Sequence, residues 1–352
     1  MNYVDKMTSR ERLETVLRGE VPDRVPVFCH GHGIARHMLA ISYGAMVQSV
    51  DLMSKSILQW QELIGEDRLW AYFDMMTEAA GFGQPMIYQE DQPPYSERND
   101  LLIKGPDDYF KLEPYDVEKA ERTRMTLEVA SILRDKRGDT VPVASLVSEP
   151  FVVLGLLRGM EALLMDCIRH PEAVKAGLDV VCEVIIDYAK AMKRHGVDLV
   201  VMCHDYGNRS IMSEKLWMKL QGEHLKRINQ VIRDEGLILD IHNCDAAPYI
   251  DAAFDDLGGC DIYECAVLPA SCATWAEYKQ KYGSRAVLQG EWWPPELAAV
   301  SYEEVLAKSK EMIDNLGEGG GFILGPTCEF PSHGPIANAK ALVDASRLYG
   351  TY

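Results

Sequence analysis

Short apolar runs that alternate with helical stretches constrain the fold of this chain more than any other feature. Several of these runs, such as Leu199-Val200-Val201-Met202, lack the in-and-out alternation of a half-exposed strand. Continuous apolar strands are typical of parallel sheets that are covered on both faces. The eight runs are residues 24–29, 68–73, 141–146, 197–203, 237–241, 261–265, 285–288 and 321–324.

The stretches between the runs carry the signals of helices. Thr8 and Glu11 form a capping box ahead of the first apolar stripe, and Ser301 is expected to cap a helix over residues 302–315. Further helices are predicted over residues 171–194 and 214–233. Eight strand–helix units in 352 residues predict an α/β fold of the (β/α)₈ TIM-barrel class. A doubly wound open sheet, which usually has fewer strands, is the alternative.

The stretch 81–115 is too long and too rich in glycine and proline for a single helix. Residues 86–89 and 101–104 flank the turn Gln92-Pro-Pro-Tyr95, which predicts a β-hairpin inserted after the second strand, near the barrel mouth. No linker, repeat or low-complexity tract interrupts the rest of the sequence. The prediction is therefore one barrel domain over residues 1–352.

The net charge of the chain makes some classes of binding partner less favourable than others. Thirty-six basic and 54 acidic side chains give a net charge of −18. Such a surface repels phosphate backbones and anionic lipids, which argues against nucleic-acid or membrane partners. No apolar run reaches the length of a membrane span, and the N-terminus lacks a signal peptide, so a cytoplasmic protein is expected. An odd count of nine cysteines argues against a disulfide framework.

Titratable side chains gather just after the predicted strands, where barrel enzymes place their active sites. The candidates for catalysis at these strand ends are Glu149, Asp205 and Glu264. The candidates for substrate binding are His30, Tyr206, Trp292, Trp293 and Glu329. A histidine or tryptophan at such a position is also compatible with ordinary packing.

His242 and Cys244 follow the fifth strand, and Cys328 follows the eighth. Two ligands at i and i+2 of an extended segment point to the same side, so they can hold one metal ion. One imidazole and two thiolates form an open, catalytic type of zinc site. By themselves these three residues are also compatible with core packing, since buried cysteine and histidine are common.

Motifs along the chain resemble the uroporphyrinogen decarboxylase superfamily. The matching segments are Thr8-Ser-Arg-Glu-Arg12, Leu17-Arg-Gly-Glu20, Pro22-Asp-Arg-Val-Pro26, Glu149-Pro-Phe151, Leu157-Arg-Gly-Met-Glu161, Met165-Asp166, Asp205-Tyr-Gly207 and Ser213-Glu-Lys-Leu-Trp217. The resemblance covers essentially the whole chain and implies a (β/α)₈ barrel.

The superfamily has two branches with different chemistry. The decarboxylases bind a polyanionic tetrapyrrole through an arginine pair after the first strand, which the segment Cys29-His-Gly-His-Gly-Ile-Ala-Arg36 lacks. The cobalamin-dependent methyltransferases carry a His-x-Cys and a later cysteine as zinc ligands, which His242, Cys244 and Cys328 match. The resemblance therefore implies Zn²⁺ and a corrinoid supplied by a partner protein. Asp245 in place of the usual glycine, and Gln289-Gly-Glu-Trp-Trp293 in place of Gly-Asn-Val-Asp, depart from the pattern.

A methyl transfer in either direction is compatible with this resemblance. The favoured prediction is O-demethylation, in which a methyl group moves from an aromatic methyl ether to Co(I), with Trp292 and Trp293 as an aromatic wall. Zinc, or an acid such as Glu149, Asp205 or Glu264, would assist the leaving oxygen. The alternatives are a methylcobalamin:thiol methyltransferase of the coenzyme M type, a metal-free decarboxylase and a non-catalytic zinc or corrinoid-binding module.

Two smaller predictions complete the site and the assembly. Glu291 is nominated as a fourth zinc ligand or as a residue around the ligands, against a role at the helix start or in binding substrate. A homodimer is suggested by the resemblance alone.

Overall fold

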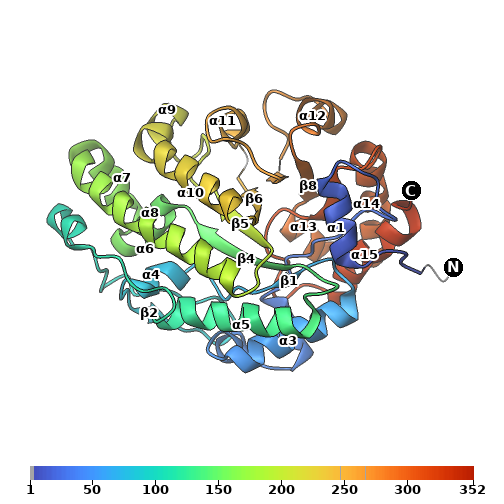
Figure 1. Cartoon of the computed structure of the whole chain (residues 1–352), viewed down its shortest axis with the longest axis horizontal. Helices are drawn as coiled ribbons and strands as arrows, with labels where there is room; N and C mark the ends of the chain where they lie inside the picture. The colour runs from blue at the N-terminus through green and yellow to red at the C-terminus, as the bar shows by residue number, and fades with distance from the viewer. Residues whose placement is uncertain (1–3, 246, 266) are drawn as a thin grey trace.

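The computed structural model describes residues 4–245, 247–265 and 267–352, and the side chain of Glu291 lies outside this description. Seven parallel strands form one sheet in the order β1-β4-β5-β6-β7-β8-β9, with helices packed around it (Figure 1). The strands are β1 Leu69–Trp70, β4 Val143–Ser148, β5 Leu199–Cys203, β6 Ile238–Asn243, β7 Ile262–Cys265, β8 Val287–Trp292 and β9 Phe322–Pro326. All seven coincide, to within a few residues, with predicted runs.

The first predicted strand, residues 24–29, is an extended segment that joins the ends of this sheet. Phe28 N donates to Leu324 O of β9 at 3.0 Å, and Asp67 N donates to Val27 O at 2.8 Å, just before β1. A single parallel bridge between Val27 and Leu324 is recorded here rather than a full strand. The α/β fold with a curled parallel sheet is thus TIM-barrel-like, as predicted.

The register of the central strands sets the position of the functional side chains. Cys203 of β5 pairs with His242 of β6, His242 pairs with Glu264 of β7, and Glu264 pairs with Gln289 of β8. Paired residues of parallel strands point to the same face of a sheet. These four side chains therefore form one row across the sheet.

The helices confirm most of the predicted boundaries. The capping boxes at Thr8 and Ser301 are both present, and α8 spans Pro171–Arg194. The predicted helix over 214–233 is interrupted by a π-helical turn, Met218–Gly222. The other helices are α1 Ser9–Leu17, α2 Tyr43–Val47, α3 Val50–Ile64, α4 Thr77–Gly81, α5 Glu121–Arg137, α6 Pro150–Arg158, α7 Met160–Arg169, α9 Glu214–Trp217, α10 Glu223–Asp234, α11 Ile250–Asp255, α12 Trp275–Tyr282, α13 Pro294–Ala299, α14 Tyr302–Leu316 and α15 Ile336–Tyr349, with 3₁₀ turns at Ile34–Met38 and Pro106–Lys111. None of the helices described here is long and apolar enough to cross a membrane.

The predicted hairpin is present after β1, but its second arm was placed wrongly. β2 Met86–Ile87 pairs antiparallel with β3 Tyr95–Ser96, not with residues 101–104. The backbone of residues 101–104 is hydrogen-bonded to a helix instead, since Ile103 N donates to Leu157 O at the end of α6. An apolar run in a loop can thus pair with a helix end instead of a strand.

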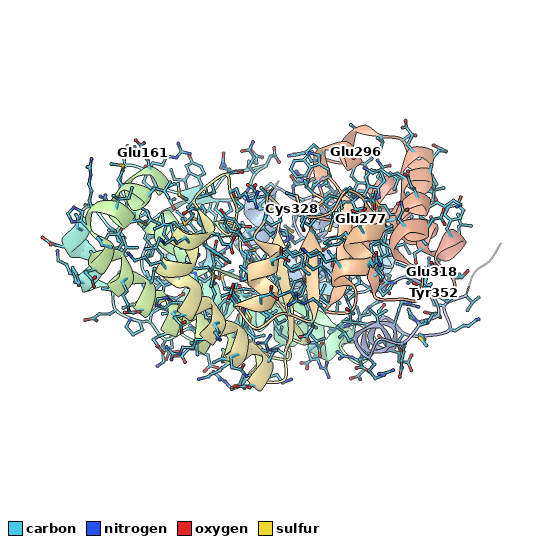
Figure 2. All side chains as sticks on the ribbon, turned by 90° about the horizontal axis from the view of Figure 1, so that it is seen from above. Glu161, Glu277, Glu296, Glu318, Cys328 and Tyr352 are labelled. Carbon is cyan, nitrogen blue, oxygen red and sulfur yellow. The ribbon has the colours of Figure 1, made fainter. Side chains whose placement is uncertain are left out.

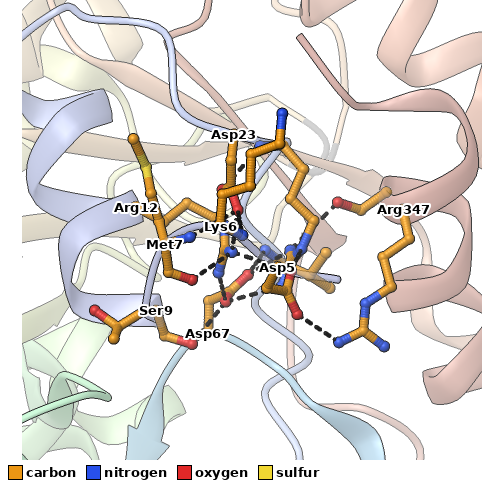
Figure 3. A network of polar contacts seen from close by, with 12 residues as sticks. Asp5, Lys6, Met7, Ser9, Arg12, Asp23, Asp67 and Arg347 are labelled. Atoms are coloured by element: carbon orange, nitrogen blue, oxygen red, sulfur yellow. Dashed lines mark hydrogen bonds and ion pairs between the residues drawn. The ribbon is translucent and has the colours of Figure 1, made fainter. Parts of the chain in front are cut away.

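A buried ionic cluster ties the amino-terminal segments together at the start of β1 (Figure 3). Arg12 of α1 donates to Asp23 and Asp67, and Arg24 donates to Asp5 and Asp67. We call Asp5, Arg12, Asp23, Arg24 and Asp67 the amino-end cluster. It fixes the extended segment that precedes His30, because Asp67 also accepts the N–H of Val27 at 2.8 Å.

Candidate metal centre

The three predicted ligands meet at one point. The ligand atoms of His242, Cys244 and Cys328 lie within 4.8 Å of one another. His242 is the last but one residue of β6, Cys244 directly follows this strand, and Cys328 comes from the turn after β9. Figure 2 shows Cys328 near the middle of the molecule, between Glu161 of α7 and Glu296 of α13. His242 is buried, whereas both cysteines are partly exposed.

A carboxylate fixes the orientation of the histidine. Nδ1 of His242 is hydrogen-bonded to Oε2 of the fully buried Glu264. Burial alone would raise the pKa of Glu264, but its contacts with the imidazoles of His30 and His242 hold that pKa well below its usual range. With Nδ1 occupied in this way, Nε2 of His242 is left as the nitrogen for a metal ion.

His30, a predicted substrate-binding residue, lies beside the carboxylate that bonds His242. Its Nε2 lies 2.9 Å from Glu264 Oε1 and 2.9 Å from Gln289 Nε2. Burial and the nearby Arg68 lower the pKa of His30 to about 3, so the ring is neutral at physiological pH. Its backbone has φ 51°, which is uncommon for a residue other than glycine.

Asp205, a predicted catalytic residue, lies beside the sulfur of Cys244. Its Oδ1 is 3.9 Å from Cys244 Sγ. Burial raises the pKa of this carboxyl above its usual value. Cys203, Asp205 and His242 form a second cluster with metal-ligand geometry, which shares the histidine with the first.

Glu149, also predicted to be catalytic, is engaged by three nitrogen donors. It accepts the backbone N–H of Tyr206 at 2.6 Å, the Nε1–H of Trp217 at 3.2 Å and the Nε2–H of Gln221 at 2.6 Å. The last donor belongs to the π-helical turn, Met218–Gly222. The carboxyl of Glu149 therefore links the segment Asp205–Tyr206, which follows β5, to the π-helical turn.

The remaining substrate candidates fall into different environments. Tyr206 is partly exposed, and its ring packs edge-on against Phe151. Glu329 accepts the N–H of Gly33 at 3.0 Å, and its other oxygen lies 3.2 Å from His32 Nε2. A Cβ at Gly33 would stand 2.1 Å from Glu329 Oε1, so only glycine permits this approach.

The two tryptophans do not form a common wall. Trp292 is fully buried and donates from Nε1 to Ser309 Oγ of α14 at 3.0 Å, and Lys308 Nζ lies 4.6 Å from the centroid of its ring. Trp293 is 46% exposed at the start of α13. Neighbouring residues of a strand point to opposite sides, which explains the separation. The nominated ligand Glu291 has its side chain outside the described residues.

An ionic pair that the sequence pattern did not predict lies inside the sheet. Arg68, at the start of β1, and Asp240 of β6 are both fully buried, with 3.6 Å between Nη1 and Oδ2. A signal was present, because Asp240 interrupts an apolar run and stands two residues before His242, on the same face. A charge inside a strand that is otherwise apolar deserves a functional explanation.

The donor set fits zinc. Two thiolates and one neutral imidazole are ligands that Zn²⁺ accepts at about 2.3 Å and about 2.0–2.1 Å in a tetrahedral site, with one position left for a substrate. A hydrogen bond from Cys244 and the proximity of His242 hold the pKa of the Cys328 thiol well below its usual value. The site can therefore supply a thiolate ligand together with an open coordination position.

The comparisons with known proteins agree with this geometry. The model of the family described as uroporphyrinogen decarboxylase (URO-D) matches residues 8–349. The methylcobamide:CoM methyltransferase MtaA of Methanosarcina barkeri is 25% identical, over 98% of this chain and 99% of its own length. The methylcobamide:CoM methyltransferase MtbA of Methanosarcina acetivorans is 23% identical, over 97% and 98%.

A solved structure supports the fold independently. The methyltransferase from Methanosarcina mazei superposes with a TM-score of 0.79 at 22% identity, and the match covers 98% of this chain and 99% of that one. The motifs, the barrel-like sheet and the match over nearly the whole length lead to one conclusion: the chain belongs to the uroporphyrinogen decarboxylase family.

Proposed function

We propose that this protein is a corrinoid-dependent methyltransferase that moves a methyl group from a methylcorrinoid to a thiol. The observation that carries the proposal is the convergence of His242, Cys244 and Cys328, whose ligand atoms lie within 4.8 Å of one another. The relatives named as methylcobamide:CoM methyltransferases match this chain nearly end to end, which supports the same chemistry.

The ether-demethylase prediction has less support than this alternative. It depended on Trp292 and Trp293 as an aromatic wall, and the ring of Trp292 is packed against α14. The relatives' names likewise refer to methylcobamide and CoM, not to an aromatic ether. The decarboxylase alternative requires no metal and leaves the three clustered ligands without a purpose.

The chain's own groups have distinct tasks in the proposed reaction. When bound, zinc lowers the pKa of a coordinated thiol and so supplies a thiolate at neutral pH. Asp205, whose pKa is raised by burial and which lies 3.9 Å from Cys244 Sγ, is the group that we propose accepts the proton that the thiol loses. Glu149 holds the Asp205–Tyr206 turn in place through its bond to Tyr206 N. Glu264 keeps His242 oriented.

The balance of the step is simple. The thiolate sulfur attacks the methyl carbon, a carbon–sulfur bond forms, and the cobalt–carbon bond breaks with both electrons left on cobalt as Co(I). We propose that a partner protein presents the corrinoid, since this sequence carries no Asp-x-His-x-x-Gly motif of the kind that binds cobalamin.

Metal content and methyl transfer together test the proposal. We expect about one zinc per chain and the loss of methylcobalamin absorbance when a thiol such as 2-mercaptoethanesulfonate is added. Cys328→Ala should lose the metal and reduce the rate by at least about 100-fold. Cys167→Ala, in the distant helix α7, is the matched control and should keep both properties.

The opposite outcomes are equally clear. Formation of methylcobalamin from methoxylated aromatics and Co(I) corrinoid, without transfer to any thiol, would restore the ether-demethylase prediction. Full activity after chelation would exclude a metal-dependent reaction.

A further inference from the structure

Arg68 is the one arginine in the described part of the chain whose side chain ion-pairs with Glu264. Its guanidinium carbon lies 4.2 Å from the ring centroid of Phe28 and 4.2 Å from that of Trp70. The side chain is fully buried. A guanidinium between two aromatic faces is held by cation–π attraction and cannot move to water, so its charge stays at a fixed place.

This fixed charge faces two carboxylates. Arg68 Nη1 lies 3.7 Å from Glu264 Oε1 and 3.6 Å from Asp240 Oδ2. Both carboxyl groups are fully buried, where an unpaired negative charge is costly, so the nearby guanidinium stabilises Glu264 with Oε1 turned toward it. Arg68 therefore decides how the carboxylate of Glu264 can sit.

Glu264 connects this cation to the metal ligand. Its Oε1 faces Arg68 and His30, while its Oε2 bonds Nδ1 of His242. Nε2 of His242 stays free for a metal only while Oε2 of Glu264 bonds Nδ1, and this requires that Oε1 remains turned toward Arg68 and His30. Carboxylates that orient metal-bound histidines commonly control metal affinity by about 10–100-fold.

We propose that Arg68 is a positioning residue of the metal centre, which acts through Glu264 to hold His242 with Nε2 toward the metal. Among the described residues, no hydrogen bond or ion pair joins Arg68 to His242, Cys244 or Cys328. The inference rests on the metal site of the proposed function, and it is independent of the direction of methyl transfer.

Zinc affinity, measured by competition with a chromophoric chelator, tests the proposal without any activity assay. Arg68→Met should weaken zinc binding by about 10–100-fold. Arg68→Lys keeps the charge but not the planar stacking group, and should recover most of that loss. In the Co²⁺-substituted protein, Arg68→Met should change the visible ligand-field bands, because the histidine ligand is no longer held in place.

The matched control is Arg24→Met, which also removes a buried guanidinium, from the amino-end cluster. It should lower the melting temperature but leave the zinc affinity within about 2-fold. If Arg68→Met does not fold, Arg68→Gln takes its place with the same expected loss. Zinc affinity in the folded Arg68 variant equal to that of wild type would overturn the inference, while absence of zinc from wild type would instead overturn the proposed metal site.

Discussion

Asp67 and Arg68 are consecutive residues that belong to two different buried ionic clusters. The clusters differ in how many of their guanidinium nitrogens have a hydrogen-bond acceptor. Asp67 belongs to the amino-end cluster, where every nitrogen of the Arg12 and Arg24 guanidinium groups has a hydrogen-bond acceptor within 3.1 Å (Figure 3). Arg68, the next residue, faces its carboxylates at 3.6 and 3.7 Å, and its three nitrogens have no hydrogen-bond partner among the described side chains.

The difference separates stability from function. A saturated buried cluster locks segments together, and it lies at the amino ends of the strands, where barrel proteins place stabilising residues. An unsaturated cluster costs stability, because desolvated charges lack full compensation. Its connection to His242 runs through Glu264, which is the basis of the role at the metal centre that we propose for it.

The largest change in unfolding free energy is expected in the amino-end cluster. Asp67→Asn leaves Arg12 and Arg24 without their shared carboxylate, and breaking a buried pair in this way commonly costs about 3–5 kcal/mol. Urea denaturation of the metal-free protein should show this loss, with zinc affinity nearly unchanged. An unchanged unfolding free energy, or a selective loss of zinc, would remove the distinction between the clusters.

The buried Glu78 is a further ionisable group that is only partly hydrogen-bonded, and its effect on stability depends on pH. Its Oε1 accepts the N–H of Ser148 at 2.9 Å, while its Oε2 has no partner in the described part of the chain. Burial raises the pKa of Glu78 from 4.5 to about 7. Between these values the folded state keeps a proton that the unfolded state releases. The stabilisation is therefore complete below about pH 4.5 and is lost as the pH rises toward 7.

Glu78→Gln should flatten this dependence. Unfolding free energies measured at pH 5 and pH 8 should differ by about 2–3 kcal/mol more in wild type than in the variant. Glutamine keeps the acceptor for Ser148 N, so the fold is expected to persist. Parallel pH profiles for the two proteins would show that Glu78 is not held protonated.

The smallest effect is expected at the edge of the amino-end cluster. Ser9 Oγ donates to Asp67 Oδ1 at 2.8 Å, in a partly buried position. Because Asp67 keeps both arginines, Ser9→Ala should cost about 1 kcal/mol. Thermal unfolding measures it, and a loss as large as that of Asp67→Asn would mean that the cluster depends on every member.

Much of the site could be read from the sequence because it lies at strand ends. His242-Asn-Cys244 follows an apolar run directly, and ligands at i and i+2 share a face whatever the details of the barrel. Cys328 follows the last run in the same way. The roles of Glu149 and His30 were harder to predict, since one holds a turn and the other packs around a ligand.

Trp292 shows the limit of that approach. A position next to a strand end does not say on which side of the strand the ring lies, and one residue of register exchanges the barrel interior for the helix layer. The single domain over residues 1–352, the mouth-covering insertion over 81–115, the homodimer and the roles assigned to the individual site residues stay predictions.

The sequence by itself predicted the parallel α/β fold and the clustering of His242, Cys244 and Cys328 as candidate metal ligands. Hydrophobic periodicity and the position of a residue at a strand end are local properties, so they can be read from the sequence alone. Only the tertiary structure decided which charges meet inside the sheet. Arg68, Asp240 and Glu264 are far apart in the chain, and their contact depends on strand register and on the Phe28–Trp70 stack.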